Sequence, residues 1–128
     1  MKVALLHLCF FEYTVQLANA LAAANVDLIL IHPQNLTTKT QPLLDPRIKV
    51  ITFKKYRIRD PRNLSAMGEL MKIIRKMQPD VLHVQETNDP WYDLTLFFNK
   101  MPALVTTIHD VFRHPGDKDN VIGSEYTR

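Results

Sequence analysis

Five short apolar runs alternate along this chain with longer segments of helical period, and this alternation is the strongest constraint on its fold. The runs are nearly continuous in hydrophobicity, which is typical of strands covered on both faces. Strands separated by helices predict an α/β fold, with an open, mainly parallel, Rossmann-like sheet and helices on both faces. Because crossovers between parallel strands are right-handed, we expect the strand order 3-2-1-4-5. The predicted strands are Lys2–Leu8, Val26–His32, Ile48–Phe53, Asp80–Gln85 and Ala103–His109.

Three helices are predicted between these strands. The first runs from about Glu12 to Ala24 and ends at Asn25, which tolerates the left-handed conformation of a helix C-terminus. The second spans about Asn63–Met77, and the third begins with Asp89 as N-cap and Pro90 as first helical residue. The stripes expected to face the sheet are Tyr13, Leu17, Leu21 and Ala24, then Met67, Leu70, Met71, Ile74 and Met77, then Leu94, Phe97, Phe98 and Met101.

Length and composition are those of a single soluble domain. The chain has 128 residues, of which 46% are apolar and 23% charged. No segment approaches the roughly 20 apolar residues that span a bilayer, and His7 interrupts the only run resembling a secretory signal. The single cysteine, Cys9, lies in an apolar run and predicts a buried thiol in a reducing compartment. We expect a cytoplasmic protein. The proline-containing residues 33–46 are expected to form a loop.

The net charge of +3 is unevenly distributed. One acid, Asp60, accompanies a group of basic residues between positions 47 and 62. One interpretation is a solvated loop and strand edge. The other is a surface that meets an anionic acceptor or makes peripheral contact with an anionic membrane. No nucleic-acid partner is expected. The basic residues are Arg47, Lys49, Lys54, Lys55, Arg57, Arg59 and Arg62.

Two of the predicted strands end on polar, titratable side chains. Gln85 and Glu86 follow the run that begins at Pro79, and His109 and Asp110 follow the run that begins at Ala103. The carboxyl ends of the strands form the ligand crevice of an open α/β sheet. These four side chains therefore predict a binding or catalytic site at that edge.

The turn after the first predicted strand, which contains Phe10, Phe11 and Glu12, faces this site in the expected strand order. Glu12 either caps the first helix or reaches into the crevice, and both interpretations stay open. The turn has no glycine, which argues against a Walker loop and against a dinucleotide-binding dehydrogenase. With one cysteine and no His-x-x-x-His pair, no zinc site is expected, and no serine lies in a nucleophile elbow.

His109 is the best candidate for a functional side chain. A histidine at the end of a strand can exchange hydrogen bonds with a sugar hydroxyl or a phosphate near neutral pH. The alternative is a histidine that caps its own loop through a backbone carbonyl. His83, inside its strand, is expected to be a hydrogen-bonded core residue. Trp91 is expected to pack rather than to stack on a sugar.

In order and spacing, these segments resemble the N-terminal domain of family 4 (group 1) glycosyltransferases. The resemblance covers almost all of residues 1–110 and implies a GT-B enzyme, in which two Rossmann-like domains surround a cleft. It implies transfer of a sugar from a nucleotide-sugar donor with retention, without a catalytic metal or other cofactor. The N-terminal domain of such an enzyme binds the acceptor. The C-terminal domain binds the nucleotide and carries two glutamates eight residues apart. The segments concerned are Lys2–Leu8, Glu12–Ala24, Val26–His32, Gln78–Gln85 and Thr107–Asp110.

The resemblance also implies residue roles. His109 matches the reaction centre, where it hydrogen-bonds donor or acceptor while the leaving phosphate takes the acceptor's proton. Glu12 matches the acidic residue closing the family's first loop, and Gln85 matches a polar position on the cleft rim. Phe10 and Phe11 depart from the family pattern, because they stand where paired glycines approach the donor phosphates. No two glutamates of this chain are eight residues apart.

Two functions follow. The first is the acceptor-side portion of a retaining glycosyltransferase over residues 1–110, with 111–128 as a tail where the domain is cut short. It requires a donor-binding C-terminal domain or a separate chain as partner, is inactive without it, and acts on a sugar, lipid or other anionic acceptor. The alternative is a non-catalytic Rossmann-like interaction module, in which Phe10 and Phe11 close the phosphate site.

Overall fold

The computed structural model describes residues 1–8, 10–85 and 89–109. Their strands form one parallel sheet in the order β3-β2-β1-β4-β5, so the predicted α/β class and strand order are confirmed. Cys9, Glu86, Asp110 and the predicted tail 111–128 lie outside the described residues. The strands are β1 (Lys2–Leu6), β2 (Asp27–Pro33), β3 (Lys49–Phe53), β4 (Val81–Gln85) and β5 (Ala103–Thr107). The α-helices are α1 (Phe11–Ala23), α2 (Thr37–Thr40), α3 (Asn63–Met77) and α4 (Pro90–Phe98).

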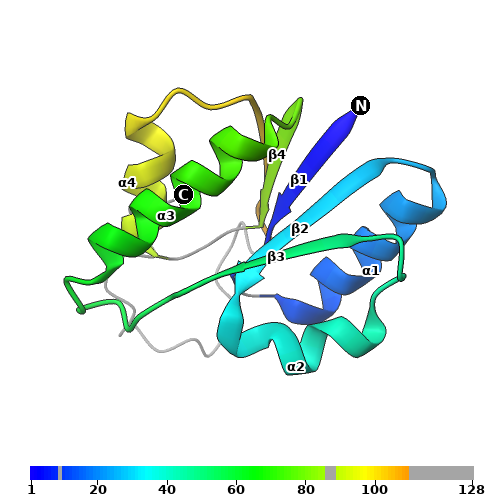
Figure 1. Cartoon of the computed structure of the whole chain (residues 1–128), viewed down its shortest axis with the longest axis horizontal. Coiled ribbons are helices and arrows are strands. Elements are labelled where there is room, and N and C mark those ends of the chain that lie inside the picture. The colour runs from blue at the N-terminus through cyan, green and yellow to red at the C-terminus, as the bar shows by residue number, and fades with distance from the viewer. Residues whose placement is uncertain (9, 86–88, 110–128) are drawn as a thin grey trace.

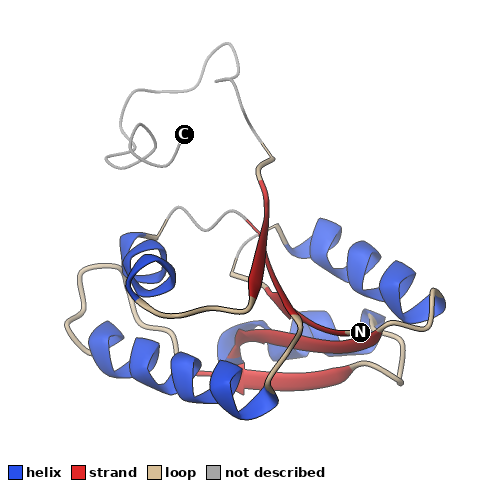
Figure 2. Cartoon of the chain, turned by 90° about the horizontal axis from the view of Figure 1, so that it is seen from above, coloured by secondary structure: helices blue, strands red, loops and turns tan. Residues whose placement is uncertain are grey.

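Helices cover both faces of the sheet (Figures 1 and 2). Ala4 and Leu6 of β1 pack in one core cluster with residues of α3 and with Tyr92 of α4. Val3 and Leu5 point to the other face, where they pack with α1. Burial on both faces explains why the strand sequence is continuously apolar, and each large buried side chain contributes about 1.5–3 kcal/mol before the entropy cost of folding. The two edge strands are less buried: among the residues of β3 only Phe53 is buried, and most residues of β5 are exposed.

The predicted stripe of α3 is correct, because Met67, Leu70, Met71 and Ile74 are buried. The predicted stripe of α1 is correct in part. Leu17 and Leu21 are half-buried and pack against the core on this face of the sheet, whereas Tyr13 is 63% exposed and Ala24 is exposed. The buried residues of this helix are Thr14, Val15, Ala18 and Ala22. Most of these side chains are small, which lets the helix backbone approach the sheet closely.

Of the predicted buried face of α4, Leu94, Phe97 and Phe98 are exposed, and only Met101, beyond the helix end, packs half-buried against the core. Asp89 caps the helix as predicted, with its side chain accepting a hydrogen bond of 3.1 Å from the Trp91 backbone N–H. This cap directs the first turn inward, so that Tyr92 is fully buried against Phe53. Residues on one helix face recur every three to four positions, so Phe97 and Phe98 cannot share the face of Tyr92.

Residues 33–46 form more structure than the predicted loop. Two short 3-10 turns, Gln34–Leu36 and Gln41–Leu43, flank the single turn of α2. The Thr40 hydroxyl donates a 2.7 Å hydrogen bond to the Leu36 carbonyl, a contact that composition does not reveal. No helix in the described part of the chain is long and apolar enough to cross a bilayer.

Candidate functional site

The parallel pairing of β4 and β5 brings Gln85 and His109 together. His109 Nε2 lies 2.6 Å from Gln85 Oε1, although 24 residues separate them in the sequence. The register pairs Gln85 with Thr107, so the bond reaches two positions further along the second segment. His83 Nε2 makes the same diagonal contact, at 2.7 Å, with the Thr107 hydroxyl. Side chains two residues apart on a strand share a face, so the two bonds lie in one row along the sheet.

The contact with Gln85 defines which ring nitrogen of His109 carries a proton. An amide oxygen only accepts hydrogen bonds, so the Nε2 of His109 carries the proton and donates it. Gln85 is 1% exposed, whereas His109 is half-buried. The buried amide therefore orients a histidine that reaches the surface. His83 is half-buried and hydrogen-bonded, as predicted, and its pKa is lowered by burial.

Aromatic rings from the start of α1 cover the His109 imidazole. The Phe10 ring stacks on it at a centroid distance of 4.0 Å and an interplanar angle of 27°. The Tyr13 ring lies 4.8 Å from it at 49°. Phe10, Phe11, Glu12 and Tyr13 also line an open pocket of about 330 Å³. The structure thus brings the start of α1 to His109, which follows β5 and contacts Gln85 at the end of β4.

Phe10 holds an unusual backbone conformation. It is the N-cap of α1, with φ 59° and ψ 51°, in the left-handed region. Its carbonyl accepts hydrogen bonds from the backbone N–H and the hydroxyl of Thr14. A non-glycine residue there costs roughly 1–2 kcal/mol, which glycine avoids. The backbone at Phe10 therefore has a conformation that glycine adopts without strain.

The other predicted site residues are less fully placed. Glu12 is exposed in the first turn of α1, near the positive end of the helix dipole, and the N-cap residue Phe10 makes no side-chain capping hydrogen bond. Both interpretations of Glu12 therefore stay open. Glu86 and Asp110 lie outside the described residues.

Two buried histidines extend the site, and sequence reasoning missed them. His7 is fully buried, and its Nδ1 donates a 3.0 Å hydrogen bond to the hydroxyl of Thr14, which itself donates to Phe10. His32 is also fully buried, and its Nδ1 donates a 2.8 Å bond to the Pro33 carbonyl. Their rings lie 6.4 Å apart. The signal in the sequence was a histidine interrupting or ending an otherwise apolar strand.

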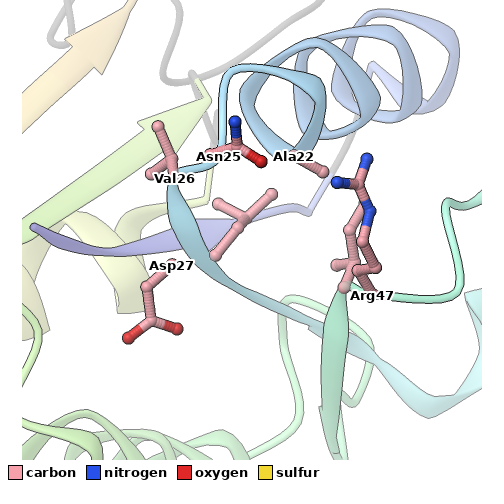
Figure 3. Close-up of a pocket in the computed structure, with 7 residues that line it drawn as sticks. Ala22, Asn25, Val26, Asp27 and Arg47 are labelled. Carbon is pink, nitrogen blue, oxygen red and sulfur yellow. The ribbon is translucent and has the colours of Figure 1, made fainter.

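Two further pockets lie elsewhere on the sheet. Figure 3 shows one of about 240 Å³ beside Asn25, Asp27 and Arg47, at the amino ends of β2 and β3. It lies on the edge of the sheet opposite the His109 site. Its lining residues form no second hydrogen-bonded group of titratable side chains. The other, of about 280 Å³, lies at the carboxyl ends of β2 and β3 and includes Lys55 and Arg57. Among residues 1–8, 10–85 and 89–109, no three His, Cys, Asp or Glu side chains group as metal ligands.

Comparison with known proteins identifies the family and supports the fold. The profile of the family described as glycosyl transferase 4-like matches residues 2–127. The chain is also similar to the crystal structure of a glycosyltransferase from Rickettsia africae ESF-5, with a TM-score of 0.63 and 17% sequence identity. That likeness, which concerns the fold, covers 90% of this chain and 31% of the other. The chain thus spans about a third of the length of that protein. No curated protein matches the sequence significantly.

Proposed function

The chain belongs to the glycosyl transferase 4-like family, and we propose that it forms the acceptor-side part of a retaining glycosyltransferase with a nucleotide-sugar donor. The observation that carries this proposal is the hydrogen bond between His109 and Gln85 at the carboxyl edge of the sheet. That edge is where open α/β sheets bind ligands, and here it holds a histidine in one orientation and one tautomer.

In the proposed reaction, the bond between the sugar's anomeric carbon and the nucleoside diphosphate breaks. A bond to the acceptor oxygen forms on the same face of the sugar, and the acceptor's proton passes to the leaving diphosphate. His109 hydrogen-bonds a hydroxyl of the donor sugar or the acceptor. The rings of Phe10 and Tyr13 lie near His109 without preventing this, because imidazole nitrogens form hydrogen bonds in the plane of the ring. Gln85 acts as a positioning residue.

The second part of this proposal concerns where the nucleotide binds. A glycine turn at a helix start leaves the backbone N–H groups open to phosphates. At the start of α1 this chain instead has Phe10, whose ring stacks on His109. We infer that the nucleotide is held by a C-terminal domain or a separate chain.

The experiment is a transfer assay with the 128-residue chain, alone and together with the polypeptide encoded in the adjoining downstream reading frame. A panel of uridine and guanosine diphosphate sugars is offered, and release of the nucleoside diphosphate is followed with and without candidate acceptors. We expect acceptor-dependent release only from the combined sample, and a product with the anomeric configuration of the donor. Product of inverted configuration would contradict the retaining mechanism.

One observation favours a second function, that of a non-catalytic interaction module. The Phe10 ring covers one face of the His109 imidazole. Calorimetric titration of the combined sample with the same nucleotide sugars separates the two functions. Binding supports the transferase. No binding by wild type or by the Phe10→Gly variant, which lacks the ring, supports the module.

A further inference from the structure

A pocket of about 280 Å³ at the carboxyl ends of β2 and β3 is distinct from the residues around His109. Its walls include Pro33 at the end of β2, Asn35 in the turn that follows, and Lys55, Tyr56 and Arg57 after β3. We propose that this pocket binds the anionic group, a phosphate or a carboxylate, of the acceptor. The assignment to the acceptor rests on the proposed function, whereas binding of the anion does not.

The charge of the pocket is the first support. Its lining contains two basic residues, Lys55 and Arg57, and no acidic residue. The Lys55 ammonium lies 3.3 Å from the buried carboxylate of Asp89, so its charge is partly compensated. Arg57 makes no ion pair within the described part of the chain. Its planar guanidinium suits bidentate recognition of phosphate or carboxylate.

Ion pairs elsewhere in residues 47–62 narrow the choice of the residue that would bind the anion. Arg47 lies 2.8 Å from Asp45, and Arg62 lies 2.6 Å from Asp60. Hydrogen bonds from Arg47 lower the pKa of Asp45 to about 2, and those from Arg62 lower the pKa of Asp60. Both arginines are therefore paired locally. A basic surface, which was one of the two interpretations of residues 47–62, is thus reduced to a smaller set that includes Arg57.

The backbone that presents Arg57 is held firmly. Asn63, which is fully buried at the start of α3, accepts a 3.2 Å hydrogen bond from the Tyr56 N–H and donates a 2.8 Å bond to the Arg57 carbonyl. Trp91 Nε1 donates a 2.7 Å bond to the Ile58 carbonyl, which agrees with its predicted packing role. Arg62 stacks over the Tyr56 ring, 4.4 Å from its centroid.

The opposite wall is also fixed. The buried His32 donates a 2.8 Å hydrogen bond to the carbonyl of Pro33. Pro33 directly precedes the turn Gln34–Leu36, which contains Asn35. Both walls are therefore set by buried polar side chains before a ligand arrives. Such preorganisation lowers the entropy cost of binding a small anion.

Direct binding tests the proposal on the 128-residue chain without any nucleotide sugar. Trp91 is the single tryptophan, and its indole contacts the residue after Arg57, so its fluorescence reports on the pocket. Pyrophosphate is titrated at constant ionic strength against a chloride control, and vesicles of phosphatidylcholine with or without phosphatidylglycerol are titrated separately. Arg57→Gln is compared with Arg59→Gln, which removes the same charge two residues away from an exposed site outside the pocket.

We expect saturable pyrophosphate binding that Arg57→Gln weakens about tenfold and Arg59→Gln leaves unchanged. Binding only to the anionic vesicles, with the same dependence on Arg57, supports the pocket and identifies a lipid headgroup as the source of the anion. Equal loss in both variants, or no binding to either probe, overturns the proposal. Thermal melting of both variants checks that each is folded. Because no sugar transfer is measured, failure here leaves the proposed transferase function standing, and failure of the transfer assay leaves this result standing.

Discussion

His109 donates a hydrogen bond to Gln85 across the boundary between the residues that follow β5 and the end of β4. The pair lies two positions beyond the β4–β5 register, as does the contact between His83 and Thr107. The candidate catalytic histidine lies two residues beyond β5, and its partner Gln85 is the last residue of β4. A partner on a strand end holds its position more precisely than one on a loop.

Replacing Gln85 by leucine is expected to release the His109 ring. The side chains are similar in size, but leucine cannot accept the Nε2 proton, so the neutral ring will populate both tautomers. Nitrogen-15 NMR of the neutral imidazole at alkaline pH distinguishes one tautomer from a mixture. Thr107→Val is the control, because it removes the partner of His83 only. An unchanged His109 tautomer in Gln85→Leu would show that the amide does not orient the ring.

The pH dependence of stability provides a second test. Burial lowers the pKa of His83 from its usual 6.5. The unfolded chain therefore takes up this proton at a higher pH than the folded chain does. Stability is lost as the pH falls from about 6.5 toward the lowered folded pKa, and it is regained as the pH rises.

His83→Gln cannot take up this proton, so its free energy of unfolding will change less between pH 8 and pH 5. Urea denaturation of both proteins across this range measures the difference. Subtracting the two curves removes the contributions of the other histidines. If the difference in free energy of unfolding between wild type and His83→Gln does not vary with pH, a lowered pKa at His83 is contradicted.

The backbone at Phe10 predicts an inverted order of stability for two small substitutions. Phe10→Gly and Phe10→Ala both remove the ring that stacks on His109, but only alanine keeps a side chain at φ 59°. The glycine variant should be more stable by about 1 kcal/mol, measured by urea denaturation. At the helical residue Tyr13 the same pair should show the usual order, with alanine more stable by about 1 kcal/mol. Equal stabilities at position 10 would argue against strain there.

Tyr92 offers a test of the core. Its hydroxyl is fully buried and has no hydrogen-bond partner in the described part of the chain. Burial and the nearby Asp89 carboxylate raise the pKa of this phenol. Removing an unpaired buried hydroxyl recovers a desolvation cost of about 1–3 kcal/mol, so Tyr92→Phe should be at least as stable as wild type. A loss of more than about 1 kcal/mol in urea denaturation would show that the hydroxyl has a stabilising partner.

Sequence reasoning succeeded where local chemistry agrees with the global fold. Continuous apolar strands indicated burial on both faces, and Asp89 and Asn25 have the capping roles that their side chains favour. The amphipathic α3 presented one clear stripe. The approach of His109 to Gln85 followed from the expected strand order, because both residues end strands that are neighbours in that order.

It failed where several arrangements were equally compatible with the pattern. The faces of α1 and α4 were misassigned in part, because apolar residues surround much of each helix and tertiary packing decided which side chains are buried. The left-handed Phe10 could not be foreseen, since phenylalanine rarely adopts that conformation. Likewise, the neutralisation of Arg47 and Arg62 depends on turn geometry that formal charge does not describe.

The most direct test of the central claim compares His109→Ala with His83→Gln in the combined transfer assay. Both variants lose a histidine that makes the same diagonal contact, but only His109 is proposed to touch substrate. The account predicts that His109→Ala lowers kcat by about 100-fold or more, whereas His83→Gln stays close to wild type. Wild-type kcat in His109→Ala would contradict the role assigned to His109.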